Sequence, residues 1–592
     1  SNEEERLWGI VNANPADFNS WTQLIQETEK LVPFVSSFLF QDDIVKFRQC
    51  YDTFLAEFPL CYGYWKKYAD HENRLATPEK TIEVYERAVK AVTHSVDIWV
   101  HYCSFVSAAK PEDPEALRRL FERGLSHVGT DYLAHQLWDK YIDFEYSHSN
   151  WVGITQLYTR ILQIALQALD RYFSHFKELA NNRPIAELKG PEDSAEADNT
   201  VPEQIDKAGA DETAEAPKDP EVERFIRRRE ELYKSTKEWD AKVREYETAI
   251  RRPYFHVKPL DDLQLLNWHR YLDFLEKEGD FDKIVKAYER CVIACANYPE
   301  YWIRYIHTME AKSRSEIADD ALDRALHIFV KRRPEIHIYA ARFKERREDA
   351  AGARKEYSVL SSEIAPGLLE VISKHANFEK RQGNIDGACA IYESALEVEK
   401  AKEESRVLSF LYIQYIRFLS EVRTSDAFLS DSILALALEK LPNSKVILEA
   451  AIHFETLSPE KDIPKLEAII ERAILSSGSD AALQSSDREE ISSLFLEFLD
   501  SYGTVEDCKR AELRHRQAFL YSRSSDSKKR SSLDSAVSDR SKLVKTGSNA
   551  VAGYTNGQAQ WSYQNWQQPQ QQWNQAYPVR TFWFQCHASY KS

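Results

Sequence analysis

The sequence predicts an all-α protein, an α-solenoid of helix-pair repeats in two arrays joined by a linker helix. Three observations indicate this fold. A W-x-x-Y pattern recurs at Trp65–Tyr68, Trp99–Tyr102, Trp138–Tyr141, Trp268–Tyr271 and Trp302–Tyr305. Trp65 and Trp99 are 34 residues apart, as are Trp268 and Trp302, and this period is typical of stacked helix pairs. Glycine and proline number only 17 and 21 in 592 residues, as expected of a mostly helical chain.

The W-x-x-Y pattern marks the first helix of each pair. At 3.6 residues per turn, a Trp and a Tyr three positions later lie on one helix face, and that face must be buried. We therefore expect ten aromatic side chains to form the core of the repeats rather than a binding site: Trp65, Tyr68, Trp99, Tyr102, Trp138, Tyr141, Trp268, Tyr271, Trp302 and Tyr305.

A second pattern, close to Y-E-R-A, marks the second helix of each pair. It occurs at Tyr85–Ala88, Phe121–Gly124, Tyr288–Cys291 and Leu322–Ala325, among others. The small last residue would let a neighbouring backbone approach closely, and the charged pair is expected to stay in water.

Composition divides the chain into five segments. Residues 187 to 220 contain eleven acidic residues, three lysines and no aromatic residue, which predicts disorder. Pro253 and Pro259 predict an ordered, non-helical junction, whose candidate surface residues are Arg251, Arg252 and Tyr254. The expected segments are a first repeat array at 1–183, an acidic disordered insert at 184–222, a charged linker helix with the junction at 223–260, a second array with dimerisation repeats at 261–520, and a disordered Ser/basic, then Gln/Trp-rich tail at 521–592.

These residues also carry a family resemblance. W-x-x-Y-x-x-F/E followed by Y-E-R-A resembles the half-a-tetratricopeptide (HAT) repeat, which is known chiefly from RNA-processing proteins. The runs Arg251 to Glu276 and Tyr288 to Tyr305, with Trp65 to Glu72 and Asp97 to Phe105, resemble the pre-mRNA-processing factor 39 family. The resemblance covers residues 5 to 520.

The resemblance implies a role in pre-mRNA splicing in the nucleus. The expected partners are proteins of the U1 small nuclear ribonucleoprotein, which selects 5′ splice sites, including alternative ones. A second copy of the chain is also implied, bound through the C-terminal repeats from Ile372 to Phe519. Burying the open end of a solenoid in a partner copy is physically reasonable.

Charge and motifs exclude several other functions. The net charge of −17 opposes broad attraction to a phosphate backbone, so we expect pre-mRNA or U1 RNA to be contacted indirectly or weakly. The sequence contains no phosphate-binding loop, metalloprotease motif or nucleophile elbow, and its eight cysteines lack zinc spacing. We therefore expect no enzyme activity, cofactor, metal or small-molecule substrate, and the lack of a long apolar run predicts no membrane association. Since the chain starts at Ser1 and its single methionine is Met309, we expect the natural N-terminus to lie elsewhere.

Two other functions remain open at this point. The chain could be a dimeric HAT scaffold of mRNA 3′-end cleavage, although the run from Arg251 to Glu276 favours splicing. It could also bind RNA directly, through a local basic groove or by base stacking on the Gln/Trp-rich tail.

Overall fold

The computed structural model describes residues 2–30, 41–190, 220–422, 427–475 and 483–520. Every regular element in these ranges is helical, which confirms the predicted all-α class. The chain forms two compact units, residues 1–441 and 442–592. These two units differ from the five segments inferred from composition, and the five-segment division stays a prediction. Most of the acidic insert expected at 184–222 and all of the tail expected at 521–592 lie outside the described residues.

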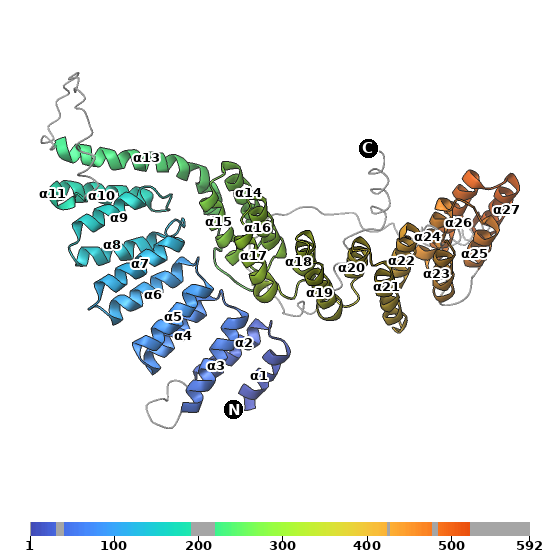
Figure 1. Ribbon diagram of the computed structural model, residues 1–592, viewed down its shortest axis with the longest axis horizontal. Coiled ribbons are helices and arrows are strands. Elements are labelled where there is room, and N and C mark those ends of the chain that lie inside the picture. Colours follow the sequence, from blue (N-terminus) through green and yellow to red (C-terminus); the bar gives the residue numbers. More distant parts are fainter. Residues whose placement is uncertain (1, 31–40, 191–219, 423–426, 476–482, 521–592) are drawn as a thin grey trace, which may run out of the picture. The chain divides into compact units, whose positions relative to one another are not determined.

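The first unit begins with a stack of antiparallel helix pairs (Figure 1). Helix α4 packs on α5 and α8 on α9, while α6 contacts the first helices of both neighbouring pairs, α4 and α8. This pattern is that of a solenoid, in which each repeat is covered by its neighbours. The helices are α1 (Asn2–Ala13), α2 (Phe18–Glu29), α3 (Gln41–Glu57), α4 (Tyr62–Leu75), α5 (Pro78–Ala91), α6 (Val96–Ala109), α7 (Pro114–Val128), α8 (His135–Ser147), α9 (Trp151–Ile161), α10 (Leu169–Asn182) and α11 (Ile185–Leu188).

Helix boundaries follow local chemistry. Pro78 and Pro114 are the first residues of α5 and α7, where a missing N–H costs no helical hydrogen bond. The Asp113 carboxylate caps α7 by accepting a hydrogen bond of 2.9 Å from the Ala116 N–H.

The linker helix is part of the repeat stack. Helix α13 (Pro220–Ala249) packs on α10 at one end and on α14 (Asp262–Glu278) at the other. Phe225 belongs to the core of the first array and Val243 to the core of the helices that follow. The helix therefore serves as a long second helix shared by two repeats, and residues 250–261 then run as the expected non-helical junction.

The remainder of the first unit continues the stack of helix pairs. Two of its second helices end in a π-helical turn; in the first, the Val330 N–H donates to the Ala325 carbonyl at 3.0 Å. After α14 the elements are α15 (Phe281–Ala294), α16 (Pro299–Ala311), α17 (Ser315–Arg324), η2 (Ala325–Phe329), α18 (Pro334–Arg346), α19 (Ala350–Val359), η3 (Leu360–Ile364), α20 (Leu369–Arg381), α21 (Ile385–Lys400), α22 (Leu408–Val422) and α23 (Ala427–Lys440).

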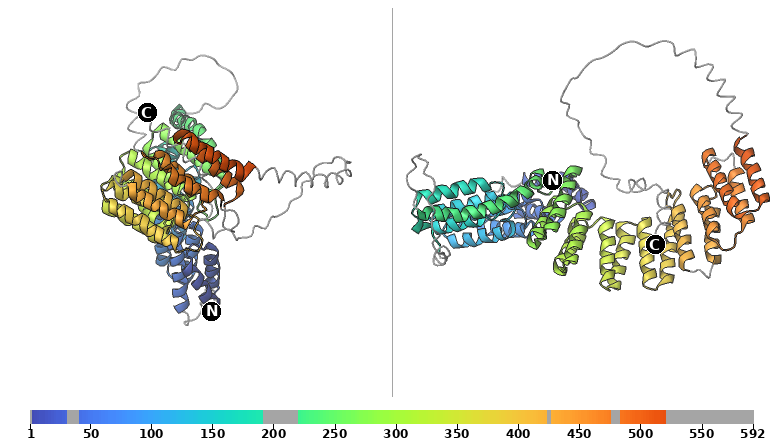
Figure 2. Two further views of the ribbon diagram at one scale, coloured as in Figure 1. Left: turned by 90° about the vertical axis from the view of Figure 1, so that its right-hand side faces the viewer. Right: turned by 90° about the horizontal axis from the view of Figure 1, so that it is seen from above.

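The second unit is a smaller group of helices (Figure 2). Helix α26 contacts α24, α25 and α27 and so lies at its centre, with Phe495 and Leu499 buried. The elements are α24 (Lys445–Leu457), α25 (Ile463–Leu475), α26 (Ser485–Tyr502), α27 (Val505–His515) and η4 (Arg516–Leu520).

Candidate functional site

The ten aromatic residues of the W-x-x-Y pattern are all buried. Their exposed fractions run from 0% to 6%. Several indoles also tie their helix to the turn before it: Trp99 donates to the Thr93 carbonyl at 2.8 Å, and Trp302 to the Ala296 carbonyl at 2.9 Å. A buried indole N–H usually finds such a partner, although the N–H of the buried Trp268 has none among the described residues. These rings therefore hold the repeats together and offer no binding surface.

The charged pair of the second pattern joins successive repeats. Glu86 on α5 accepts a hydrogen bond of 2.6 Å from the Tyr102 hydroxyl on α6 and two bonds, of 3.0 and 2.8 Å, from Arg123 on α7. The Arg123 guanidinium lies 5.2 Å from the ring centre of Trp99. We call this arrangement, an acid of one second helix bound to the Arg of the next, a B-helix clamp.

B-helix clamps recur along the first unit. Glu289 on α15 accepts bonds from Tyr305 at 2.7 Å and from Arg324 at 2.8 and 3.0 Å, and Arg324 lies 5.4 Å from the Trp302 ring. Burial alone would raise the pKa of Glu289, but the charge of Arg324 and its hydrogen bonds, together with His94 and the Tyr305 hydroxyl, hold the pKa below its ordinary value. The other clamps are Asp52–Arg87, Glu122–Arg160 and Glu247–Arg290.

The expectation that these charged pairs stay in water is wrong for part of the chain. In the Tyr288–Cys291 motif the Glu289 and Arg290 side chains are only 12% and 14% exposed, whereas in the Phe121–Gly124 motif those of Glu122 and Arg123 are 46% and 43% exposed. Each motif places an acid and an arginine next to each other in the sequence, but the two do not pair. The acid binds the arginine of the next second helix, and the arginine binds the acid of the preceding one.

A second series of ion pairs links the C-terminal ends of the first helices. Arg346 on α18 bonds to Glu310 on α16 at 2.8 Å, and Arg381 on α20 bonds to Glu345 on α18 at 2.7 Å. Lys380 on α20 bonds to Glu421 on α22 at 3.2 Å, so in this pair the basic residue lies on the earlier helix and the acid on the later one. We call these contacts A-helix rungs. The hydrogen bond from Arg381 holds the pKa of Glu345 below its ordinary value.

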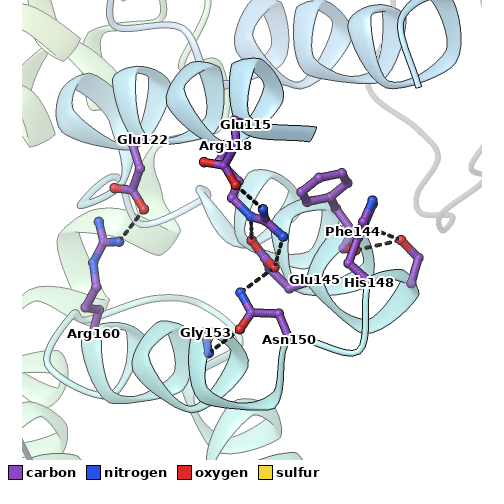
Figure 3. Close-up of polar contacts among 10 residues, drawn as sticks. Glu115, Arg118, Glu122, Phe144, Glu145, His148, Asn150, Gly153 and Arg160 are labelled. Carbon is purple, nitrogen blue, oxygen red and sulfur yellow. Dashed lines mark hydrogen bonds and ion pairs between the residues drawn. The ribbon is translucent and has the colours of Figure 1, made fainter. Parts of the chain in front are cut away.

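A third set of polar contacts closes individual repeats, as Figure 3 shows. Glu145 on α8 accepts bonds of 2.7 and 3.0 Å from Arg118 on α7 and one of 2.8 Å from the Asn150 side chain. Asn150 in turn caps α9 by accepting from the Gly153 N–H at 3.1 Å. A Cβ at Gly153 would lie 2.3 Å from the Asn150 amide nitrogen, so a larger residue here would have to displace the capping side chain.

The first array contacts the following repeats along a polar seam within the first unit. Asp131 bonds to Arg290 at 2.9 Å, and Glu57 binds both Lys331 and Arg332, at 2.7 and 2.6 Å. A cavity of about 270 Å³ lies at the seam, lined by residues of the α5–α6 turn and of α15–η2. Because these partners lie far apart in the chain, sequence patterns could not reveal them.

The junction residues have different roles. The Arg251 and Arg252 N–H groups both donate to the Gln264 side-chain oxygen, at 3.1 and 3.0 Å. The Arg252 guanidinium donates to the Lys258 carbonyl at 2.8 Å and so fixes the loop, whereas Tyr254 is 43% exposed. Arg252 is therefore a structural residue, and the Arg251 and Tyr254 side chains remain available at the surface.

Three observations on the described residues concern metal ions, thiols and membranes. Within these ranges no group of three or more His, Cys, Asp or Glu side chains could hold a metal ion. Burial raises the pKa of the Cys50 and Cys61 thiols to about 12, which makes them poor nucleophiles. No helix among the described residues is long and apolar enough to cross a membrane.

The fold and the clamps define the class of this protein: a HAT-repeat α-solenoid of the scaffold type. Residues 5–178 match the family described as PRP39 N-terminal HAT repeat, and residues 241–381 match PRP39 C-terminal HAT repeat. The chain belongs to the pre-mRNA-processing factor 39 family.

Individual relatives support this membership. The chain is 38% identical over 542 residues to pre-mRNA-processing factor 39-2 of Arabidopsis thaliana, a match that covers 88% of this chain and 51% of that protein. It is 33% identical over 518 residues to pre-mRNA-processing factor 39 of Xenopus laevis, covering 84% of this chain and 78% of that one. The chain thus spans about half the length of the Arabidopsis relative.

Among solved structures, the crystal structure of CstF-77 is similar in fold. Its TM-score is 0.52 at 12% sequence identity, and the match covers 78% of this chain and 89% of that chain. The likeness confirms the predicted HAT solenoid and shows the fold alone.

Proposed function

We propose that this chain is a non-enzymatic scaffold in pre-mRNA splicing that associates with the U1 small nuclear ribonucleoprotein in the nucleus and affects 5′ splice-site choice, including alternative sites. The observation that carries the proposal is family membership across both arrays, since the relatives are named pre-mRNA-processing factors. The architecture is suited to this role because clamped repeats form an extended surface that proteins can bind.

A splicing assay tests the role directly. Depleting the protein from nuclear extract should change the ratio of products from a substrate with two competing 5′ splice sites, and adding purified protein should restore it. Unchanged product ratios after complete depletion would contradict the proposal.

The scaffold acts as a homodimer through the C-terminal repeats. The second unit supports this part of the proposal because it exposes large apolar side chains: Leu475 is 59% exposed, Val505 71% and Leu513 56%. Exposed apolar surface on a terminal repeat calls for a partner, and a second copy presents the same surface.

Light scattering tests the dimer on residues 1–520. The expected mass is twice that of the chain, and changing Leu475 and Val505 to Glu should halve it. Leu263→Glu is the matched control, since Leu263 is 75% exposed but lies on α14 of the first unit. A monomer at micromolar concentration before any substitution would exclude the dimer.

RNA is contacted indirectly or weakly in this proposal. The net charge of −17 and the engagement of the clamp and rung arginines with carboxylates both oppose tight phosphate binding. Submicromolar binding of residues 1–520 to short single-stranded RNA, with a steep salt dependence, would support the direct RNA-binding alternative instead.

The 3′-end cleavage alternative receives no support beyond the fold. The likeness to CstF-77 is at 12% identity and concerns architecture only. Co-purification with 3′-end cleavage proteins instead of U1 proteins would favour that function.

A further inference from the structure

Among the described residues, the repeat that contains the second half of α13 has no first helix. Residues 246–249 of α13 read Y-E-T-A, and Glu247 forms a B-helix clamp with Arg290. In the repeat that follows, the Trp of the first helix stands 20 residues before the Tyr of the second. The corresponding residue of α13 is Ile226, which lies on the same continuous helix, and that half of α13 packs on α10 (Figure 1). No described first helix therefore precedes α14 in this repeat.

One position of the first helices faces the first helix before it, two residues after the motif Trp. Lys67 holds this position on α4 and reaches Glu29 on α2 at 3.3 Å. Arg304 holds it on α16 and bonds to Asp273 on α14 at 2.5 Å. In α14 the same position is Arg270, which is exposed and forms no ion pair with another described residue. Arg270 therefore lacks the acid that this position binds in neighbouring repeats.

Two leucines share this face of α14. Leu263 and Leu266 are 75% and 44% exposed, and they precede Arg270 by seven and four residues, which places all three on one helix face. Leu266 stands two residues before the motif Trp, where the other four W-x-x-Y helices carry Gly, Asp, Gln or Glu. Leu263 lies on an additional turn, because α14 begins six residues before its Trp, whereas α4, α6, α8 and α16 begin three residues before theirs. Among the W-x-x-Y helices, the one without a described predecessor thus carries exposed leucines.

We propose that the face formed by Leu263, Leu266 and Arg270, the α14 face, docks an amphipathic helix of a partner protein in the place of the first helix. The partner helix covers the two leucines with apolar side chains and presents an Asp or Glu to Arg270. Charge complementarity selects an acidic helix, because basic residues at this position bind acids in other repeats. Laying the apolar side of a helix on an apolar surface is a common mode of recognition.

The α14 face goes beyond the proposed splicing role and does not rest on it, since the repeat register alone defines the face. It also differs from the proposed dimer contacts, which lie on the second unit. A partner helix at this place extends the stack beside α13 and α14, where repeats are stabilised by contacts with their nearest neighbours.

A peptide that copies a first helix of this chain is the probe. Helix α8 is suitable because its Asp139 accepts a bond of 2.8 Å from Arg171 on α10. Arg171 stands two residues after Leu169, which takes the place of the motif Trp, and so holds the position of Arg270. The peptide is stapled to keep it helical, labelled with a fluorophore and titrated with the full-length chain, with fluorescence anisotropy as the readout. A photo-reactive benzoylphenylalanine at position 263 of the chain then shows by cross-linking whether the peptide lies on α14.

The peptide should bind, and Arg270→Glu should weaken binding at least about tenfold because like charges then face each other. Asp139→Arg in the peptide should weaken binding to the parent chain and restore binding to the Arg270→Glu chain. Leu266→Glu should weaken the binding of both peptides. Lys140→Glu in the chain is the matched control: Lys140 is also exposed two residues after its Trp, but α6 already packs on α8, so the affinity should stay unchanged. Circular dichroism should show equal helix content in all variants.

Failure of the peptide to bind the parent chain, or an affinity that Arg270→Glu and Leu266→Glu both leave unchanged, would overturn the inference. Cross-links that map only outside the α14 face would also overturn it. Light scattering separates the other occupant, a second copy of the chain. If Leu266→Glu halves the mass, the α14 face is a dimer contact and the inference is wrong.

Discussion

Replacing Arg290 should destabilise the helices around it by an amount that its burial sets. Its guanidinium bonds to Glu247 at 2.7 and 2.8 Å and to Asp131 at 2.9 Å, and so serves both a B-helix clamp and the polar seam. The three side chains are between 4% and 14% exposed. Replacing Arg290 with Met keeps the apolar stem but leaves two carboxylates in a buried site without their counter-charge.

The expected cost follows from burial. Removing one partner of a buried ion pair typically destabilises a protein by about 3–5 kcal/mol. Because every 1.4 kcal/mol is about tenfold in an equilibrium constant, amide exchange in α15 should accelerate at least about 100-fold. Hydrogen-exchange mass spectrometry of α13 to α15 is the assay, since a repeat array of this length need not unfold in one step.

Arg123→Met is the matched control. It removes the same kind of clamp, but the Glu86 and Arg123 side chains are 35% and 43% exposed. Solvent-exposed pairs contribute about 0–1 kcal/mol, so exchange in α7 should change by less than about tenfold. Equal effects of the two substitutions would refute the reasoning that burial decides the cost.

The destabilisation caused by Arg290→Met should depend on pH in a definite direction. Burial raises the pKa of Asp131, and Arg290 opposes that rise, so removing Arg290 raises the pKa further. An acid whose folded-state pKa is raised binds protons more readily in the folded chain, so stability falls as pH rises through that range. The deficit of Arg290→Met should therefore shrink as the pH is lowered. Adding Asp131→Asn should recover part of the loss at neutral pH.

Three further predictions concern the repeats themselves. Trp302→Ala should cost about 3–5 kcal/mol and disrupt neighbouring repeats in urea unfolding, because the ring is fully buried. Burial opposes the ionisation of Glu356, but hydrogen bonds from His337 and Lys344 outweigh it and hold its pKa at about 2. Glu356→Gln should therefore destabilise the protein at pH 7, and the stability difference from the parent chain should disappear as the pH falls from about 4.5 towards 2. Gly153→Ala should displace the cap of α9 and cost about 1 kcal/mol in the same unfolding assay.

The repeat architecture could be predicted from the sequence because its signal is local. A Trp and a Tyr on one helix face, repeated with a fixed period, require burial wherever they occur. The helical linker and the Pro-containing junction could also be predicted from the sequence, since Pro253 and Pro259 cannot continue a helix.

The electrostatic organisation could not be predicted in the same way. Arg123 follows Glu122 in sequence but binds Glu86, so the pairing depends on the register of adjacent repeats. The seam pair of Glu57 and Lys331 joins residues 274 positions apart. The charge of the linker helix was visible in the sequence, but its packing was not: Arg229 on it is buried against Phe225, because the helix packs into the stack.

We propose above that this chain is a splicing scaffold that assembles through protein contacts. Affinity purification of the tagged full-length chain from nuclear extract, with and without ribonuclease, measures this most directly. We expect proteins of the U1 small nuclear ribonucleoprotein to remain bound after RNA digestion. Loss of all these proteins on ribonuclease treatment, with the chain itself intact, would contradict it.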